Sequence, residues 1–309
     1  MGKSKSTTLI ILAFFSIYVI WGSTYLLNKI AVTQLPPFML ASIRFICASI
    51  LIFIIGKSLG MSLKISKRQF LNTAIAGFLF LTVGNGGVVW ALKYVDSGFA
   101  ALEISSQPLV VLILMRVLQG KKIQPMSLIG VALGVIGIYL LVSQQQIITK
   151  EGSIFGMLVI FVSMLSWAYS SLFVAKSNLP NNFFINTGYQ MICGGTFLAI
   201  ASLLFGETWI PPTAWDTNVQ IAMLLLIVFG GIVAFTAFNY LLKSVSPEKV
   251  ATSTYVNPIV ALFLGWYFLE EQITMQSVIA AGILLTGVYF INTKKKLVLF
   301  SRFRKNNIN

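Results

Sequence analysis

The sequence predicts an all-α integral membrane protein, and three observations lead to that fold class. The chain has 309 residues, of which 57% are hydrophobic and only 10% are charged, whereas a soluble protein keeps roughly a quarter of its residues charged. Its apolar residues gather in ten separate runs, each close to the ~20 residues that a helix needs to cross a bilayer. Most of its basic residues lie between these runs rather than within them. Lipid is therefore the expected solvent.

We expect one membrane-spanning helix in each run. The first run follows a basic start and continues to about Ile30 without a small-residue cleavage site, so it is predicted to be an uncleaved helix. Lysines and arginines then separate the second run from the third, the fourth from the fifth, the sixth from the seventh and the eighth from the ninth. The predicted spans are residues 8–30, 37–55, 70–92, 98–118, 126–143, 153–175, 183–205, 218–242, 249–269 and 274–292.

The distribution of charge predicts the orientation of the chain. If the N-terminus is cytoplasmic, most of the 22 lysines and arginines fall on the cytoplasmic side, including the tail KKKLVLFSRFRK. Cytoplasmic loops of membrane proteins carry this excess. We therefore expect both termini in the cytoplasm and a multi-pass protein of the cell inner (plasma) membrane. This excess of basic residues on the cytoplasmic side accounts for the net charge of +14, so we expect no nucleic-acid partner. The basic tail can bind anionic lipid headgroups of the bilayer.

Residue types that the chain lacks exclude several kinds of chemistry. There is no histidine, which removes His-based catalytic triads and His-containing zinc sites. The two cysteines, Cys47 and Cys193, both lie in apolar runs, which argues against a disulfide framework or a metal cluster. No Walker motif GxxxxGK(S/T) is present, so direct use of ATP is not expected. We expect no enzyme activity, no cofactor and no metal site.

The chain also contains an internal repeat. Residues 92–139 align without gaps on residues 242–289. The most informative matches are Lys93 with Lys243, Pro108 with Pro258, Gly137 with Gly287 and Tyr139 with Tyr289. A slightly different offset places Trp21 on Trp167, Cys47 on Cys193 and Arg44 on Gln190.

We therefore predict two five-helix repeats, residues 1–146 and 147–309, within one membrane domain. Five is an odd number of crossings, so the repeats must insert in opposite orientations. Inverted repeats are a recurring plan of secondary transporters, whose substrate site lies near the midplane between the repeats.

Several segments resemble the EamA branch of the drug/metabolite transporter superfamily. They are IWGSTYL, IRF, NGGVVWALKYVDSGFAAL, YVNPIVALFLGWYFLEEQIT and GILLTGVYFI, and they cover nearly the whole chain. The resemblance implies a ten-helix inner-membrane carrier, often an exporter of amino acids, metabolites or drugs. It also implies an acidic residue where the ninth helix meets the tenth, which Glu271 fits. The repeat partner of Glu271 is Lys121, so the first half departs from the family pattern.

Two ionisable residues lie deep within predicted spans, where they are costly unless they face a cavity or a partner. Arg44 lies about seven residues into the second span and Glu103 about five residues into the fourth, both counted from the outer end. Three hypotheses remain open. The two residues form an ion pair that fixes packing, or they face the substrate, with Arg44 meeting a carboxylate or phosphate and Glu103 an amine, or Glu103 couples transport to protons.

The two repeated prolines lie in the middle of predicted spans. Pro108 and Pro258 each lack an N–H and crowd the carbonyl four residues back. Each follows a polar residue, Gln107 in the first half and Asn257 in the second. Two interpretations are open: a tolerated kink, or a paired bend that acts as a hinge and lines the substrate site.

Other polar and aromatic residues complete the predicted cavity. Trp21 and Trp167 lie far from the starts of their helices, so they are either interfacial anchors or parts of an aromatic box around a cation or ring. Asn85 and Asn239 require polar partners within the membrane. The candidate cavity residues are Trp21, Ser23, Arg44, Asn85, Trp90, Glu103, Gln107, Trp167, Tyr169, Tyr189, Asn239, Tyr240, Tyr255 and Asn257.

The leading functional hypothesis is a secondary carrier that exports small amphipathic metabolites, such as amino acids, aromatic or drug-like compounds, by alternating access. The alternative is a membrane-embedded ligand-binding or sensing protein that uses the same cavity without turnover. Gly130 and Gly134 fit the GxxxG spacing, which predicts either a packing face or a homodimer face.

Overall fold

The computed structural model of the protein describes residues 2–120, 125–143, 151–245, 250 and 253–292. Regular structure within these ranges is helical throughout, with no β-strand among them. The predicted all-α class is therefore confirmed. Residues 121–124, which include Lys121, lie outside the described residues.

The helices follow one another in chain order. The first half contains α1 (Gly2–Phe15), η1 (Ser16–Ile20), α2 (Trp21–Val32), α3 (Pro37–Ser58), α4 (Lys67–Gly77), η2 (Phe78–Gly86), α5 (Gly87–Ala91), α6 (Ser97–Ile104), α7 (Gln107–Gln119) and α8 (Pro125–Val142). The second half contains α10 (Ser153–Lys176), α11 (Phe183–Leu204), η3 (Pro212–Ala214), α12 (Thr217–Leu225), η4 (Leu226–Phe235), α13 (Thr236–Ser244), α15 (Ser253–Leu269) and α16 (Met275–Asn292). Among the described residues, each of the ten predicted ranges contains helix, whereas the prediction that all ten cross the membrane is not tested by this.

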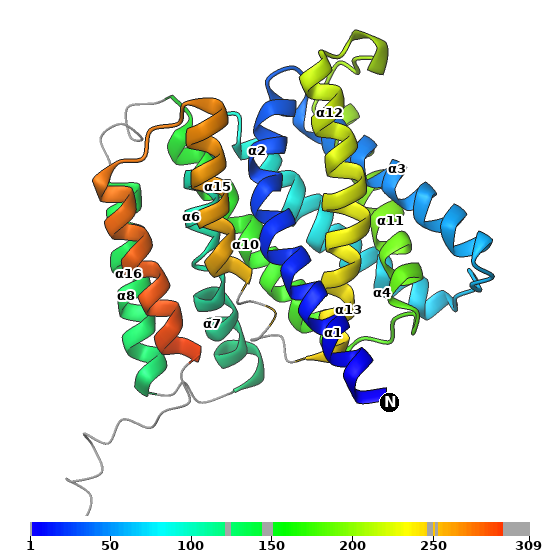
Figure 1. The fold of residues 1–309 in the computed structure, drawn as a ribbon, viewed down its shortest axis with the longest axis horizontal. Coiled ribbons are helices and arrows are strands. Elements are labelled where there is room, and N and C mark those ends of the chain that lie inside the picture. Colours follow the sequence, from blue (N-terminus) through cyan, green and yellow to red (C-terminus); the bar gives the residue numbers. More distant parts are fainter. Residues whose placement is uncertain (1, 121–124, 144–150, 246–249, 251–252, 293–309) are drawn as a thin grey trace, which may run out of the picture.

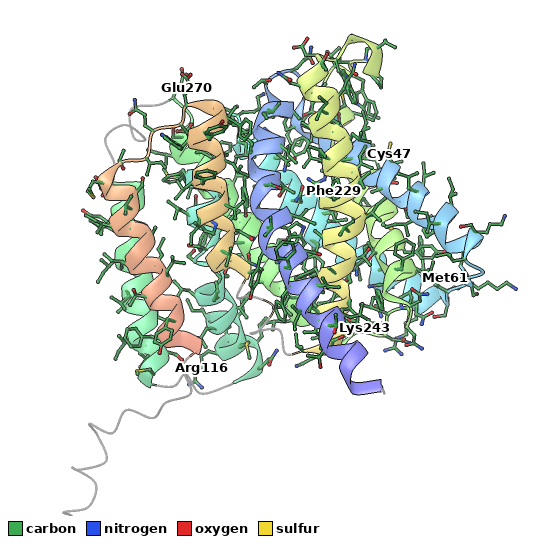
Figure 2. The ribbon with its side chains drawn as sticks, in the orientation of Figure 1. Cys47, Met61, Arg116, Phe229, Lys243 and Glu270 are labelled. Carbon is green, nitrogen blue, oxygen red and sulfur yellow. The ribbon has the colours of Figure 1, made fainter. Side chains whose placement is uncertain are left out.

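By length and composition, seven helical stretches among the described residues can cross a bilayer. They are Thr7–Val32, Pro37–Ser58, Lys67–Ala91, Ser97–Gln119, Ser153–Lys176, Phe183–Leu204 and Thr217–Ser244. Three shorter apolar helices accompany them: Met126–Gly137, Val256–Leu269 and Met275–Gly287. The outside of the bundle carries many exposed apolar side chains, such as Phe229 (Figure 2). Such a continuous apolar surface is expected where lipid surrounds the protein.

The two halves pack in corresponding ways but run in opposite directions. In Figure 1, α1 begins at the bottom of the bundle and α10, the first helix of the second half, begins at the top. Two contacts join helices that occupy equivalent places in the halves, since α3 packs along α11 and α8 packs along α16. Likewise α10 packs on η2 and α5, and α2 packs on η4 and α12. An inverted repeat produces this pattern of contacts.

Charged side chains divide between the two ends of the bundle. Arg116 and Lys243 lie at the end that carries the N-terminus, and Glu270 lies at the opposite end (Figure 2). We call these the N-terminal end and the distal end.

Several helices are interrupted near their middles. The π-helical segments η1, η2 and η4 disturb three of the long helices, and such segments are frequent at functional sites. Ser105 and Ser106 separate α6 from α7, and Pro108 then lies in the first turn of α7, where its missing N–H needs no partner. Pro258 instead lies inside α15, which continues through it. The two prolines are therefore associated with a helix break in the first half only.

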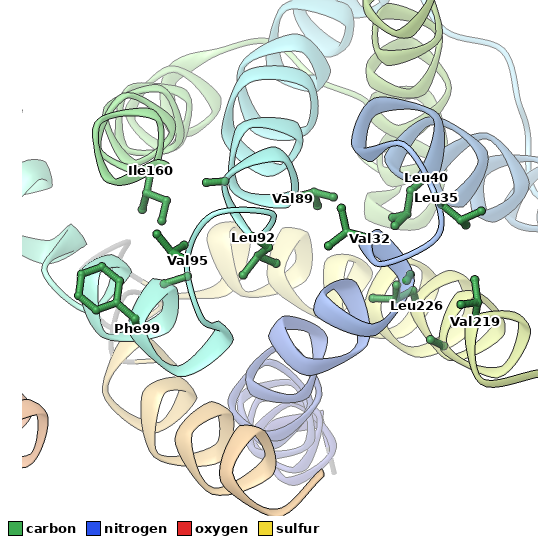
Figure 3. Close-up of a cluster of buried hydrophobic side chains, with 14 of the residues drawn as sticks. Val32, Leu35, Leu40, Val89, Leu92, Val95, Phe99, Ile160, Val219 and Leu226 are labelled. Atoms are coloured by element: carbon green, nitrogen blue, oxygen red, sulfur yellow. The ribbon is translucent and has the colours of Figure 1, made fainter. Parts of the chain in front are cut away.

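Two clusters of buried apolar side chains form the core. The distal cluster fills the distal end of the bundle and includes Val32, Leu35, Leu92, Val95 and Phe99 (Figure 3). The second cluster packs nearer the N-terminal end and includes Ile17, Phe45, Phe80, Phe238 and Leu241. Several members of the second cluster, such as Phe45 and Phe238, also line the cavity described below.

Gly130 and Gly134 are buried against helices of the same chain. A Cβ atom added at Gly134 would contact Leu109 of α7. One added at Gly287 of α16 would lie 2.8 Å from the carbonyl oxygen of Gly130 and 3.2 Å from the amide nitrogen of Gly134. The GxxxG face is therefore a packing face within the chain, and a homodimer through it stays a prediction.

Candidate functional site

A cavity with an empty volume of about 1150 Å³, counted to its open mouth, lies between the two halves. Both halves contribute to its wall. The lining residues are Trp21, Thr24, Tyr25, Asn28, Arg44, Phe45, Leu81, Gly84, Asn85, Val88, Ile104, Gln107, Val111, Ser163, Met164, Trp167, Ser171, Gly230, Phe235, Phe238, Leu242, Val250, Ser253, Thr254 and Asn257.

The cavity extends toward the N-terminal end and stops short of the distal end. On one side its lining includes Leu242, two residues before the end of α13 at Ser244. On the other side the distal cluster packs beyond Asn28 and Val88. The side chain of Lys29 also closes this end, because its Nζ donates to the carbonyl oxygens of the α5 terminus, Leu92 at 2.6 Å and Val95 at 2.8 Å. The structure is therefore closed at its distal end.

Helix α2 presents one face to the cavity. Trp21, Thr24, Tyr25 and Asn28 recur at intervals of three and four residues, so they lie on the same side of the helix. The Thr24 hydroxyl donates to the Trp21 carbonyl at 2.7 Å, and Asn28 Nδ2 donates to the Thr24 carbonyl at 2.8 Å. The side-chain oxygen of Asn28 is thereby turned toward α3.

Arg44 is the sole charged residue on the described cavity wall, and its side chain is 2% exposed. Its Nη1 donates to Asn28 Oδ1 at 3.4 Å and to Asn85 Oδ1 at 3.5 Å, which are long for hydrogen bonds. Its Nε has no acceptor. The Phe45 ring lies 4.7 Å from the guanidinium carbon. Arg44 is therefore a buried cation whose hydrogen-bonding capacity is only partly used.

The helix that carries Arg44 is firmly held. Glu207 caps α3, because its carboxylate accepts from the amides of Phe38 at 3.1 Å and Met39 at 2.8 Å. Along the helix, Ser42 and Ser49 donate to carbonyl oxygens of α11 at 3.0 and 2.8 Å. The guanidinium is therefore presented from a rigid element, as precise binding requires.

Glu103 does not pair with Arg44. Its side chain is 5% exposed, it is absent from the cavity wall, and its Oε2 has no hydrogen-bond partner. Helix α6, which carries it, packs against α2, α10 and α15. Among the described residues, the nearest acceptors of Arg44 are the two asparagines, and no ion pair joins it to Glu103. The hypothesis of an Arg44–Glu103 ion pair is therefore wrong for this structure.

The residues that precede the two prolines differ in their surroundings. Gln107 lines the cavity, and its amide makes no hydrogen bond within the described chain. Asn257 also lines the cavity. With its amide nitrogen oriented toward η1, it donates to the Tyr18 carbonyl at 2.8 Å and to the Ile17 carbonyl at 3.1 Å. Asn257 thus ties α15 to η1, whereas the Gln107 amide faces the cavity.

Aromatic side chains form the apolar part of the wall. The Trp21 and Trp167 rings meet edge to face, with centroids 5.7 Å apart and planes at 86°. Phe238 lies 5.0 Å from Trp21, and Phe235 lies 6.4 Å from it. Of the two interpretations of these tryptophans, the structure favours the central aromatic one over interfacial anchoring.

A second polar cluster occupies the equivalent region of the second half. Asn239 Nδ2 donates to Thr187 Oγ1 at 2.9 Å and to Gln190 Oε1 at 3.2 Å, and Asn186 Nδ2 donates to Asn239 Oδ1 at 3.4 Å. These side chains are at most 2% exposed and none of them lines the cavity. Gln190 is the repeat partner of Arg44. In this half the polar groups satisfy one another.

The structure brings together some of the predicted cavity residues and separates others. Those on the wall are Trp21, Arg44, Asn85, Gln107, Trp167 and Asn257. Those away from it are Ser23, Trp90, Glu103, Tyr169, Tyr189, Asn239 and Tyr240. The side chain of Tyr255 lies outside the described part of the structure.

The side chains away from the cavity have other contacts. Ser23 donates to the Ile20 carbonyl at 2.7 Å, and Trp90 packs on Tyr94 with ring centroids 4.8 Å apart. The Tyr189 hydroxyl donates to the Leu63 carbonyl at 2.8 Å. Tyr240 packs on Phe183 at 5.2 Å, and Tyr169 is 45% exposed on the outside of the bundle.

Sequence reasoning missed several residues of the wall, above all Thr24, Tyr25 and Asn28. Their spacing with Trp21 was a usable signal, because a polar and aromatic stripe at helical intervals marks one face of a helix. Gly230 and Phe238 carried no such signal, since their place on the wall depends on how η4 and α13 pack.

Known proteins resemble this chain over nearly its whole length. The profile of the EamA-like transporter family matches residues 8–143 and again residues 154–293. The chain belongs to that family. YedA, an uncharacterized inner membrane transporter of Escherichia coli (strain K12), is 34% identical over 288 residues, which cover 92% of this chain and 91% of YedA. YoaV, an uncharacterized transporter of Bacillus subtilis (strain 168), is 23% identical, with 92% and 96% covered.

One solved crystal structure superposes on this EamA-family protein with a TM-score of 0.68 at 18% identity. It covers 98% of this chain and 100% of its own, which shows the fold alone. The family resemblance predicted from sequence is confirmed. The protein is a membrane transporter rather than an enzyme, and a multi-pass protein of the inner membrane.

Proposed function

We propose that this EamA-family protein is a secondary transporter that exports small amphipathic metabolites by alternating access, with the central cavity as its substrate site. The observation that carries this proposal is the place of Arg44. A partly bonded, buried cation lies at the closed end of a cavity between two inverted halves. Ionisable side chains within membrane segments mark substrate pathways because an idle one would be costly.

The proposed direction follows from the shape of the cavity. Its lining reaches toward the N-terminal end, and the distal cluster closes the other end. The basic residues at the N-terminal end support a cytoplasmic position for that end. A cavity that is loaded from the cytoplasm suits an exporter. Residues 1–146 and 147–309 would then be the two units that rock against each other.

Counterflow in proteoliposomes tests the proposed function. Vesicles that contain the purified protein are preloaded with one metabolite from a panel of amino acids, organic acids and aromatic compounds, and uptake of the same labelled compound is followed. We expect at least one compound to accumulate transiently, as exchange through a carrier requires. If no compound gives flux with or without ion gradients, the transport proposal fails. Saturable binding without counterflow would favour the ligand-binding or sensing alternative.

A further inference from the structure

We propose that the cavity selects organic monoanions, with one carboxylate bound by Arg44 and a flat apolar body against Trp21 and Trp167. This inference rests on the proposed transport function and names its substrate class.

Arg44 is the sole charged residue on the described wall, and no carboxylate of the described chain pairs with it. A buried ion without a counter-ion is strongly unfavourable. Asn28 and Asn85 orient the guanidinium through their oxygens but carry no charge to neutralise it. A ligand that supplies one negative charge would complete the site.

The two asparagine oxygens both accept from Nη1, and Nε has no acceptor. Nη2 donates no hydrogen bond to the described residues, and a Cβ atom at Gly230 would lie 3.2 Å from it. Gly230 thus allows its backbone to pack closely against Thr24 and Nη2, where a Cβ atom would be crowded. Nε and Nη2 form the side edge of the guanidinium, which matches the two oxygens of a carboxylate. Because Nε is buried, a carboxylate would bind both donors only after the guanidinium turns toward the cavity.

A phosphate monoester carries about −1.5 to −2 at neutral pH. The described wall holds one positive charge, so such a ligand would leave negative charge uncompensated in the cavity. A single carboxylate matches Arg44.

Glu103, the sole carboxylate of α6 and α7, is buried away from the wall. An ammonium group in the cavity would therefore lack a carboxylate partner and would be repelled by Arg44. Cations and zwitterions are disfavoured relative to monoanions of the same shape.

The edge-to-face pair of Trp21 and Trp167, together with Phe235 and Phe238, lines the part of the cavity on the N-terminal side of Arg44. Aromatic side chains favour contact with other flat rings. The wall therefore combines one anion anchor with an aromatic surface.

Four probes that share one ring test this selectivity: 3-phenylpropionate, 3-phenylpropanamide, phenylalanine and 2-phenylethylamine. Binding to the protein in lipid nanodiscs is measured by calorimetry. We expect the anion 3-phenylpropionate to bind most tightly. We expect its affinity to fall roughly ten- to a hundredfold in Arg44→Gln, since a charge-assisted bond is lost. The uncharged amide should be insensitive to that substitution.

Three further variants keep the test informative if Arg44→Gln folds poorly. Arg44→Lys retains the charge but not the two-donor edge, and should weaken 3-phenylpropionate binding by less than Arg44→Gln does. Gly230→Ala keeps Arg44 but crowds its Nη2, and should also weaken binding. Arg68→Gln removes an exposed arginine outside the cavity and should leave binding unchanged.

Two outcomes would overturn the inference. If phenylalanine or 2-phenylethylamine binds the wild-type protein as tightly as 3-phenylpropionate does, the cavity does not select monoanions. If none of the four probes binds, the proposed substrate class is wrong. Neither outcome bears on transport itself, because counterflow with the metabolite panel measures that separately.

Discussion

Arg44 and Gln190 occupy equivalent positions in the two halves, and their surroundings differ in one respect. Gln190 belongs to a buried network with Asn186 and Asn239, in which donors meet acceptors. Arg44 also bonds to two asparagines, but its buried Nε has no acceptor. A fully satisfied network stabilises packing, whereas a partly satisfied one is unfavourable unless a ligand completes it. The repeated position therefore stabilises packing in the second half. In the first half, the hydrogen-bonding capacity of its side chain is only partly used.

At Glu103 we expect substitution by Gln to leave counterflow at the wild-type level and to raise the melting temperature by a few degrees. The side chain is buried off the cavity wall with an unpartnered oxygen, so replacing the carboxyl by an amide removes an uncompensated group without disturbing the site. Thermal unfolding and proteoliposome counterflow are measured on the same preparation. A folded Glu103→Gln protein without counterflow would instead show that the carboxyl takes part in transport, as the proton-coupling hypothesis requires.

At the scale of single helices, carboxylates of the second half cap helices of the first. Glu207 accepts from the first amides of α3, and Glu271 does the same for α6, where it accepts from Ser97 N at 2.8 Å and Gly98 N at 3.1 Å. Helix N-termini favour a negative charge because of their unsatisfied N–H groups. These caps fix the helices that carry Arg44 and precede Gln107, although the carboxylates lie outside the cavity.

Glu271→Ala should lower the stability by about 1–2 kcal/mol, because the α6 terminus loses its cap. Its carboxylate also accepts from the Ser97 hydroxyl at 2.8 Å, so more than one bond is removed. Denaturant unfolding in detergent measures the change. The neighbouring Glu270→Ala is a matched control, since Glu270 is exposed and caps no described helix. Equal effects of the two substitutions would argue against the cap.

Gly134→Leu should destabilise the protein by about 1–3 kcal/mol, since the added side chain must displace Leu109 between α8 and α7. Gly282→Leu on α16 is the matched control, because a Cβ atom there meets nothing within 4 Å. Thermal unfolding compares the two, and light scattering in detergent follows the mass of the particle. A change in mass with unchanged melting temperature would support the dimer interpretation.

For the molecule as a whole, the fold was predictable from sequence and the site only in part. Helices occupy the predicted ranges because lipid forces apolar runs of defined length, and the repeat follows from residues such as Pro108 and Pro258. The surroundings of Glu103 were not predictable. The depth of Glu103 in the membrane can be counted along the sequence. The direction in which its side chain points depends on how α6 packs against α2, α10 and α15, which the sequence does not specify.

The direction of aromatic side chains was likewise not predictable from residue type alone. Tyr169 lies two residues after Trp167 and points to the outside, because residues two apart on a helix face different directions. Tyr25 and Asn28 share the face of Trp21 and line the wall. Helical spacing from one well-placed tryptophan therefore locates cavity residues better than residue type alone.

Alternating access requires the distal cluster to open, and cysteine labelling can detect that opening. The test uses a background in which Cys47 and Cys193 are replaced by serine. Leu242→Cys, near the cavity mouth, should react with a membrane-impermeant maleimide from the N-terminal side. Leu92→Cys, whose parent side chain is fully buried in the distal cluster, should be protected without substrate and become reactive from the distal side during turnover.

Adding Glu271→Ala should increase the reactivity of Leu92→Cys, because the cap that Glu271 makes on α6 joins the two halves near the distal end. If Leu92→Cys stays unreactive while counterflow of a transported compound proceeds, the distal cluster is not the gate.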